Sequence, residues 1–272
     1  MIKNLIFSGG GLKGWAYIGT LRALSELIDR KGIEGVVGCS IGSVFGLFYL
    51  LDIKWDYILD YVMELNFADI IDPDIDSFII NQSILQGKIF KEIIMELISQ
   101  KIDPCITFND LWKYSKKLFT VTALNITDLK LEYFNWKLTP GIKVIDAIMA
   151  SSSLPLLFPS YRIGNSMYYD GGVCNNCPVT FVNSLGCVAF IFGEPDTSFD
   201  NGNLFKLFNC LVLLLNKSND SDEYLKFTIL DPQFKNEMVN LNQSRDDIFN
   251  IYMNGYTNSK KVLFDNFIAL KG

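Results

Sequence analysis

Gly38-Cys39-Ser40-Ile41-Gly42 joins two apolar runs: it begins at the end of the run from Glu34 to Cys39 and is followed by the run from Val44 to Leu51. The first run predicts a buried strand and the second a buried helix, which places the pentapeptide at a strand-to-helix turn. Its G-x-S-x-G pattern is that of a nucleophile elbow, in which the glycines allow a sharp turn and expose the serine. The sequence contains no histidine. Ser40 therefore cannot belong to a Ser-His-Asp triad, and a nucleophilic Ser40 would need another base.

The amino-terminal segment repeats this arrangement. Ile2 to Phe7 predicts a strand, Gly9-Gly10-Gly11-Leu12-Lys13-Gly14 a turn, and Trp15 to Arg30 a helix with regularly spaced apolar residues. A β-α-β-α unit of this kind favours a parallel sheet with right-handed crossovers. Both glycine-containing turns are then expected at the carboxyl edge of adjacent strands.

The rest of the chain predicts further elements of both kinds. A helical insertion of about residues 53–116 comprises helices at 55–66, 88–100 and 107–115, the last opened by a Thr107-x-x-Asp110 cap. Strands are expected at 118–124, 131–136, 161–163, 167–169 and 187–192, with Gly164-Asn165 as a hairpin turn. We expect a core domain at 1–192. Residues 193–272 would form a mainly helical extension packed on it, with helices at 203–216 and 244–270 and a strand at 225–230.

Composition narrows the class of protein. The 272 residues are 49% hydrophobic and carry a net charge of −6, with scattered positive residues, which predicts a globular protein that does not bind nucleic acid. The first residues leave no room for a signal peptide, and Leu204 to Leu215 is too short to span a bilayer. We expect a cytoplasmic protein whose contact with a membrane surface, if made, is mainly apolar. The six cysteines predict free thiols, and Cys174-x-x-Cys177 lacks a second ligand pair, so neither a metal nor a cofactor is expected.

The glycine turn at 9–14 has two interpretations. It matches the G-x-G-x-x-G dinucleotide fingerprint, but that motif needs an acidic residue at the end of the second strand, and Glu34 stands at its start. A P-loop is excluded because Trp15-Ala16 replaces the Lys-Ser/Thr pair. Alternatively, the amides of Gly10 and Gly11 could bind an oxyanion together with the amide of Ile41, aided by the helix N-terminus.

The base must come from Asp, Glu or Lys. Asp170, in Tyr168-Tyr169-Asp170-Gly171-Gly172, ends the predicted hairpin and is followed by two glycines that could hold it near Ser40. The same residues are also typical of an ordinary β-turn. Lys13 is a second candidate base, of the kind used by Ser-Lys hydrolases.

Taken together, these motifs resemble the patatin-like phospholipase family. That family joins a G-G-G-x-K/R-G turn, a G-x-S-x-G elbow and a D-G-G/A motif, matched here at Gly9 to Gly14, Gly38 to Gly42 and Asp170 to Gly172. Ala150 to Pro155 and Asn176-x-Pro178 agree as well, and the resemblance covers residues 2–192. It implies a three-layer α/β/α sandwich with a mostly parallel sheet. It also implies a Ser40-Asp170 dyad without histidine, an oxyanion hole at Gly10-Gly11 with Lys13 beside it, and no metal or cofactor.

The implied activity is hydrolysis of fatty acyl esters of phospholipids through an acyl-enzyme. An acylglycerol lipase, an acyltransferase of the same fold, and a non-catalytic lipid-binding or dinucleotide-binding protein remain alternatives. An aspartate is a weak base at its usual pKa of about 3.9, so we predict that burial raises the pKa of Asp170. The turn amides should carry most of the rate enhancement. Candidates for an apolar entrance are Leu154, Leu156, Leu157 and Phe158, the helical segment from Trp55 to Phe67, and Leu204 to Leu215.

Overall fold

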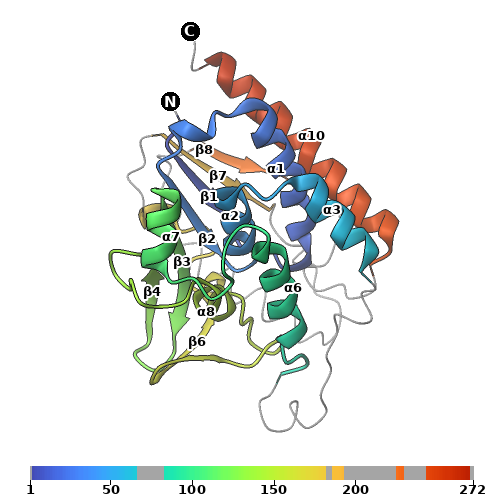
Figure 1. Cartoon of the computed structure of the whole chain (residues 1–272). Helices are drawn as coiled ribbons and strands as arrows, with labels where there is room; N and C mark the ends of the chain where they lie inside the picture. Colours follow the sequence, from blue (N-terminus) through green and yellow to red (C-terminus); the bar gives the residue numbers. More distant parts are fainter. Residues whose placement is uncertain (1, 66–82, 182–185, 193–224, 230–242, 270–272) are drawn as a thin grey trace.

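A computed structural model of the chain describes residues 2–65, 83–181, 186–192, 225–229 and 243–269 (Figure 1). The predicted helix at 203–216, which includes the Leu204 to Leu215 segment, lies outside the described residues. Among the helices that are described, none is both long enough and apolar enough to cross a bilayer.

A mixed sheet forms the centre of the molecule. Its strands follow the order β5-β6-β3-β2-β1-β7-β8, and β4 pairs with β3. The strands are β1 (Asn4–Phe7), β2 (Gly35–Cys39), β3 (Leu118–Asn125), β4 (Lys130–Phe134), β5 (Tyr161–Ile163), β6 (Ser166–Asp170), β7 (Cys187–Ile191) and β8 (Leu225–Thr228). β3, β2, β1, β7 and β8 run parallel, whereas β4, β5 and β6 are antiparallel additions beside β3. The predicted α/β class with a mostly parallel sheet is confirmed.

The helices surround this sheet (Figure 1). They are α1 (Ala16–Leu27), α2 (Ile41–Leu51), α3 (Trp55–Glu64), α6 (Lys88–Ser99), α7 (Phe108–Ser115), α8 (Val144–Ser151) and α10 (Arg245–Ala269), and short 3-10 turns lie at η1 (Gly11–Trp15), η2 (Arg30–Gly32), η3 (Gly171–Val173) and η4 (Val179–Phe181). The predicted Thr107 cap is confirmed, because its hydroxyl accepts a hydrogen bond from the Asp110 amide. The helix predicted up to Arg30 ends earlier, at Leu27, because Ile28 has extended backbone angles. α8 was not predicted as a helix.

Strand alternation divides the core between the two faces of the sheet. Leu5, Phe7 and Val36 point to the large apolar cluster that contains residues of α1, α2, α8 and α10. Ile6 and Val37 point the other way and pack against Val179 of η4 in a second, smaller cluster. The carboxyl edge of the sheet lies between these layers, where β1 and β2 lead into their glycine turns.

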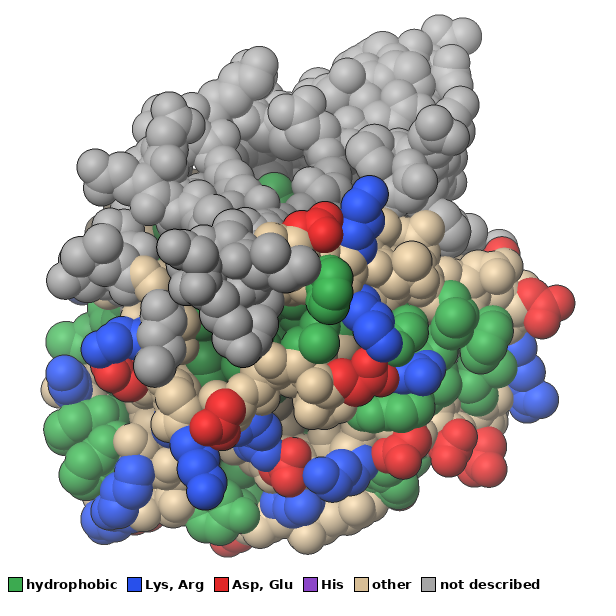
Figure 2. Space-filling model, turned by 90° about the horizontal axis from the view of Figure 1, so that it is seen from above, with side chains coloured by type: hydrophobic (Ala, Val, Ile, Leu, Met, Phe, Trp, Pro, Cys, Tyr) green, Lys and Arg blue, Asp and Glu red, His purple; other side chains and the backbone are tan. Residues whose placement is uncertain are grey.

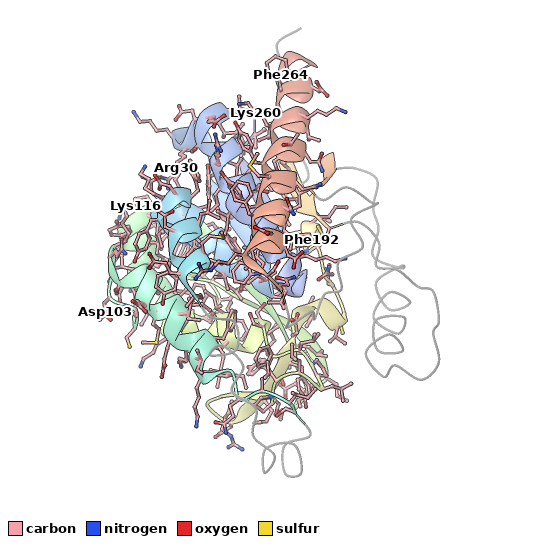
Figure 3. The ribbon with its side chains drawn as sticks, turned by 90° about the vertical axis from the view of Figure 1, so that its right-hand side faces the viewer. Arg30, Asp103, Lys116, Phe192, Lys260 and Phe264 are labelled. Atoms are coloured by element: carbon pink, nitrogen blue, oxygen red, sulfur yellow. The ribbon has the colours of Figure 1, made fainter. Side chains whose placement is uncertain are left out.

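α1 and α10 cross with their backbones almost touching. A Cβ atom added at Gly19 would lie 2.2 Å from the Tyr252 carbonyl oxygen, and one added at Gly255 would lie 2.2 Å from the Ala16 carbonyl oxygen. Lys260 on α10, labelled in Figure 3, extends the contact with an ion pair of 2.8 Å to Glu26 on α1. Described residues beyond 192 therefore contact the core at two places, α10 and β8. The predicted division into a core domain at 1–192 and an extension at 193–272 stays a prediction.

Candidate active site

The ends of β2 and β6 meet on one edge of β3. Cys39, the last residue of β2, pairs with Thr122, and Asp170, the last residue of β6, pairs with the adjacent Ala123. β4 pairs with β3 across both of these positions and so occupies the opposite edge. β2 and β6 must therefore share the remaining edge. Because β2 is parallel and β6 antiparallel to β3, their carboxyl ends face each other, which brings Ser40 and Asp170 together.

The turn at Ser40 has the geometry of a nucleophile elbow. Ser40 has φ 53° and ψ −133°, angles that a residue with a side chain rarely adopts. Such strain costs about 1–3 kcal/mol and persists only where the surroundings enforce it. Gly38 and Gly42 make the turn possible: an added Cβ would lie 2.3 Å from the Ser43 Cα at the first position and 2.2 Å from the Phe7 carbonyl oxygen at the second.

Asp170 is buried beside Ser40, with 3% of its surface exposed. The Gly172 amide donates a hydrogen bond of 2.7 Å to its Oδ1, and the Cys39 thiol approaches the same oxygen at 3.8 Å. Burial raises the pKa of Asp170 to about 6, although hydrogen bonds from Ser40, Gly172 and Cys39 act in the opposite direction. The predicted direction of the pKa shift is confirmed. At neutral pH such a carboxylate is a stronger base than an exposed one.

The first glycine turn lies against Ser40. A Cβ added at Gly9 would lie 3.1 Å from the Ser40 Cβ, and one added at Gly14 would lie 2.3 Å from a side-chain carbon of Ile41. Gly11 has a left-handed backbone, with φ 55°. Within the described residues, the amides of Gly10 and Gly11 have no hydrogen-bond acceptor. The Ile41 amide is the first of α2 and thus also unpaired within its helix.

The aromatic ring of Phe192 packs directly over Gly10, where an added Cβ would meet it at 2.1 Å (Phe192 is labelled in Figure 3). Glu34, the acid that a dinucleotide site would need, precedes β2 and pairs with Lys3 at 2.9 Å. It therefore lies at the amino edge of the sheet, opposite the glycine turn. This placement argues against the dinucleotide interpretation.

Lys13 is the charged member of the turn and is 7% exposed. Burial lowers the pKa of its ammonium group. Its side chain forms no ion pair or hydrogen bond with any residue that the structure describes. A buried cation without a partner is costly, and a negative charge placed next to it would be strongly stabilised.

Three supports of the site were not predicted as such. The Ser40 amide donates a hydrogen bond of 2.8 Å to Ser151 Oγ, and the Asp170 amide donates one of 2.8 Å to the Ser153 carbonyl oxygen. Asn176 holds Gly9 twice, because its carbonyl accepts from the Gly9 amide at 3.2 Å and its Nδ2 donates to the Gly9 carbonyl at 3.1 Å. In the sequence, these residues belong to the small-residue segment at 150–155 and to Asn176-x-Pro178, both of which agree with the family pattern. Neither segment predicted the role of a single residue.

One of the three candidate segments for an apolar entrance is the loop after α8. Leu154, Leu156 and Phe158 are partly exposed, whereas Leu157 is buried. The amides of Ile84 and Leu85 donate hydrogen bonds of 3.2 and 2.9 Å to the carbonyls of Leu156 and Leu157. The loop is thus fixed to the segment that precedes α6, close to the catalytic edge.

None of the described cysteines forms a disulfide bond; these are Cys39, Cys105, Cys174, Cys177 and Cys187. Cys39 is fully buried where β2 pairs with β3, and burial raises the pKa of its thiol well above the usual value. It is therefore an uncharged neighbour of Asp170.

Comparison with known proteins identifies the family. The model of the patatin-like phospholipase family matches residues 5–182 of the 272. The chain belongs to this family. It is 27% identical over 183 residues to a probable lipid hydrolase, 463L, of Invertebrate iridescent virus 6, covering 65% of this chain and 62% of that protein. It is 26% identical over 194 residues to the lysophospholipase NTE1 of Saccharomyces cerevisiae, covering 68% of this chain and 10% of the yeast protein.

The fold agrees with this membership. A crystal structure of VipD from Legionella pneumophila matches with a TM-score of 0.61 at 18% identity, covering 97% of this chain and 67% of that chain. At this identity the likeness concerns the fold alone. The chain is thus a patatin-like member of a family whose named relatives include lipid ester hydrolases.

Proposed function

We propose that this protein is a lipid acyl hydrolase that cleaves fatty acyl esters of phospholipids, in the manner of a phospholipase A or a lysophospholipase, with Ser40 as nucleophile and Asp170 as general base. The observation that carries the proposal is the meeting of Ser40 and the buried Asp170 where β2 and β6 end, together with the raised pKa of Asp170. Family membership supports the class of reaction.

In the first step Asp170 accepts the hydroxyl proton while Ser40 Oγ attacks the ester carbonyl carbon. The carbonyl oxygen becomes an oxyanion, to which the amides of Gly10, Gly11 and Ile41 would donate hydrogen bonds. The C–O bond to the alcohol then breaks, and the proton on Asp170 passes to the leaving oxygen. Water, deprotonated by Asp170, then attacks the carbonyl carbon of the acyl-Ser40 ester. The bond from this carbon to Ser40 Oγ breaks, Asp170 returns the proton to Ser40 Oγ, and the fatty acid is released.

Lys13 has an electrostatic role in this scheme. An ammonium group that is buried without an anion among the described residues would stabilise the oxyanion or a substrate phosphate. A role as charge should survive in Lys13→Arg and be lost in Lys13→Met, whereas a role as base should be lost in both.

A lipid substrate implies contact with a membrane or micelle surface, and we propose that this contact is peripheral and mainly apolar, made by a protein of the cytoplasm. On the face drawn in Figure 2, positive and negative side chains are intermixed over the described residues instead of separated by sign. Attraction to anionic lipid alone would favour a face of one sign.

The proposal is tested by incubating the protein with mixed-chain phospholipids and with monoacylglycerols of matched acyl chains. We expect the wild type to release fatty acid, and Ser40→Ala and Asp170→Asn to release none above background. Release by Ser40→Ala at the wild-type rate would overturn the assignment of the nucleophile.

A further inference from the structure

Tyr17 is a fully buried residue of α1 that has no part in the chemistry described above. Its hydroxyl donates a hydrogen bond of 2.8 Å to the carbonyl oxygen of Ser8, the residue between β1 and the first glycine turn. The Phe190 carbonyl oxygen, near the end of β7, lies 3.1 Å from the same hydroxyl and also accepts from the Ser8 amide. Tyr17 therefore ties the start of α1 to the ends of two strands, at the point where the glycine turn begins.

The Ser8 carbonyl lies between the two parts of the candidate active site. On the side of the elbow, a Cβ added at Gly42 would lie 2.5 Å from the Ser8 carbonyl oxygen. On the other side, Ser8 is bonded to Gly9, and a Cβ added at Gly9 would lie 3.1 Å from the Ser40 Cβ. A change in the direction of the Ser8 carbonyl would therefore shift the glycine turn relative to the nucleophile.

Hydrogen bonds fix the two peptide planes that precede the Gly10 amide. In a trans peptide the C=O group and the following N–H group point in opposite directions, so a bond to one also directs the other. Tyr17 holds the carbonyl of the first plane, whose amide, that of Gly9, donates to the Asn176 carbonyl at 3.2 Å. Asn176 Nδ2 holds the carbonyl of the second plane at 3.1 Å, so the Gly10 amide points away from Asn176. This amide has no acceptor among the described residues and is available to an oxyanion.

The ring of Phe192 supports the next residue of the turn. It packs over Gly10, where an added Cβ would lie 2.1 Å from ring carbons of Phe192. The same ring meets the Tyr17 ring edge-on, with centroids 4.8 Å apart, and the Tyr17 ring meets Phe7 of β1 edge-on at 5.3 Å. Tyr17 and Phe192 thus form one packed unit that contacts the turn at two successive positions.

Burial makes the Tyr17 hydrogen bond hard to replace. Tyr17 is fully buried and Ser8 is 1% exposed, so water cannot take the place of a lost hydroxyl. Burial also raises the pKa of Tyr17 well above its usual value. The hydroxyl therefore stays protonated and remains a donor throughout the pH range of an assay.

We propose that Tyr17 and Phe192 are positioning residues, which hold the first glycine turn so that its amides face the oxyanion formed at Ser40. The inference rests on the proposed hydrolase function and deepens it, because it names the groups that align the amides. Alignment of this kind stabilises the transition state more than the bound ester, since the oxygen carries its full negative charge only after attack. Loss of either side chain should therefore lower kcat with little effect on KM.

The first experiment measures kcat and KM of Tyr17→Phe with a lysophospholipid. We expect kcat to fall about tenfold and KM to change by less than about twofold, the pattern of an interaction made only in the transition state. Tyr252→Phe is the matched control, because it also removes the hydroxyl of a buried tyrosine, one that accepts a hydrogen bond of 2.8 Å from Arg22. It should leave both constants unchanged, although both variants lose a hydrogen bond.

Phe192 provides a second variant of the same turn. Phe192→Ala removes the ring from Gly10 and should lower kcat about fivefold with little change in KM, whereas Phe192→Leu keeps an apolar contact and should retain most of the rate. In the double variant of Tyr17→Phe and Phe192→Ala, the loss should be smaller than the product of the single losses, because both residues hold one turn. If Tyr17→Phe does not fold, Phe192→Ala takes its place in each comparison.

The second experiment separates oxyanion stabilisation from substrate binding. In a trifluoromethyl ketone with a long alkyl chain, Ser40 Oγ bonds to the carbonyl carbon, the hydroxyl proton passes to Asp170, and the carbonyl oxygen becomes an oxyanion. The inhibition constant should rise about tenfold in Tyr17→Phe, in parallel with the loss in kcat. An ether analogue of the lysophospholipid, which has no carbonyl group at this position, should bind to the wild type and the variant equally.

The outcomes distinguish the inference from the proposed function. An unchanged inhibition constant in Tyr17→Phe, or an equal loss of affinity for the ether analogue, would overturn the inference while the hydrolase function stands. Equal losses of kcat in Tyr17→Phe and Tyr252→Phe would overturn it as well. If the wild type neither hydrolyses the lysophospholipid nor binds the trifluoromethyl ketone, the proposed function itself fails.

Discussion

Two parts of this molecule bring backbones so close that only glycine fits, and they differ in what surrounds the glycine. At the elbow, a Cβ on Gly42 would lie 2.2 Å from the Phe7 carbonyl oxygen; at the α1–α10 crossing, a Cβ on Gly19 would lie 2.2 Å from the Tyr252 carbonyl oxygen. The elbow adds a strained serine, a buried carboxylate and unpaired amides within the described structure. The crossing adds packing and the ion pair between Lys260 and Glu26. Close approach alone therefore does not indicate a functional site.

The largest difference between the two regions should appear on removing the reacting groups. We expect Ser40→Ala and Asp170→Asn each to lower kcat by at least about 1,000-fold, as for nucleophile and partner in other serine hydrolases. The measurement is fatty acid release per folded molecule, with folding checked by circular dichroism. Asp170→Asn with normal turnover would remove the carboxylate from the mechanism.

Matched glycine substitutions then test the comparison itself. Gly42→Ala and Gly19→Ala should both destabilise the protein, by about 1–3 kcal/mol or more, because each methyl group collides with a carbonyl oxygen. Only Gly42→Ala should also abolish turnover per folded molecule, since it displaces the Ser40 turn. The check is denaturant unfolding together with kcat on the folded fraction. Equal loss of turnover in Gly19→Ala would mean that the crossing of α1 and α10 also controls the site.

The raised pKa of Asp170 predicts that activity increases with pH while the free energy of unfolding decreases. As a base Asp170 must be ionised, so kcat/KM should rise with pH through about 6. Because the folded pKa is raised from 3.8 to about 6, the stability that protonated Asp170 contributes is fully present below pH 3.8 and lost as pH rises through 6. The loss amounts to about 3 kcal/mol for a shift of about two units.

Asp170→Asn should accordingly stabilise the protein at pH 8 and change its stability little at pH 3.5. Thermal unfolding at the two pH values measures this effect. An unchanged or lowered stability of Asp170→Asn at pH 8 would mean that the ionised carboxylate is not penalised by burial.

Substitutions of Cys39 should shift the pH dependence of kcat/KM by a smaller amount. A hydroxyl is a stronger donor than a thiol, so Cys39→Ser should lower the Asp170 pKa and move the acid limb of kcat/KM to lower pH. Cys39→Ala removes the donor and should move the limb to higher pH. Shifts in the same direction for both variants would show that the thiol acts through packing alone.

The smallest expected effect concerns Asn176. Asn176→Ala releases Gly9 from one of its two hydrogen bonds and should lower kcat about tenfold, because the turn amides lose alignment with the oxyanion. Asn135→Ala is the control: this buried side chain also binds backbone amides, those of Lys137 and Leu138, but it follows β4, on the edge of β3 opposite β2. It should lower stability without changing kcat per folded molecule.

Local features of the fold were predictable from the sequence. The strand before each glycine turn and the Thr107 cap depend on residues close in the chain, and the structure confirms them. α8 was missed because Val144 to Ser151 is buried nearly throughout and lacks a polar face. The amino end of α2 was placed too late, at Val44 instead of Ile41.

Long-range features were not predictable in the same way. The motifs suggested that Asp170 lies near Ser40. The two residues meet because β2 and β6 end on the same edge of β3, and this depends on the strand register, which the motifs do not contain. The fit of Gly19 to Gly255 and the double contact of Asn176 with Gly9 likewise depend on segments distant in the sequence. The hydrophobic periodicity of a single segment does not predict contacts of this kind.

The most direct test of the account is the rate at which a serine-directed fluorophosphonate labels the protein, followed by mass spectrometry of the labelled peptide. We predict a single adduct on Ser40, formed at a rate that rises with pH through about 6 and falls at least about 100-fold in Asp170→Asn. Labelling of Ser40 at the wild-type rate in Asp170→Asn, or labelling of another serine, would contradict the proposed pairing of Ser40 with Asp170.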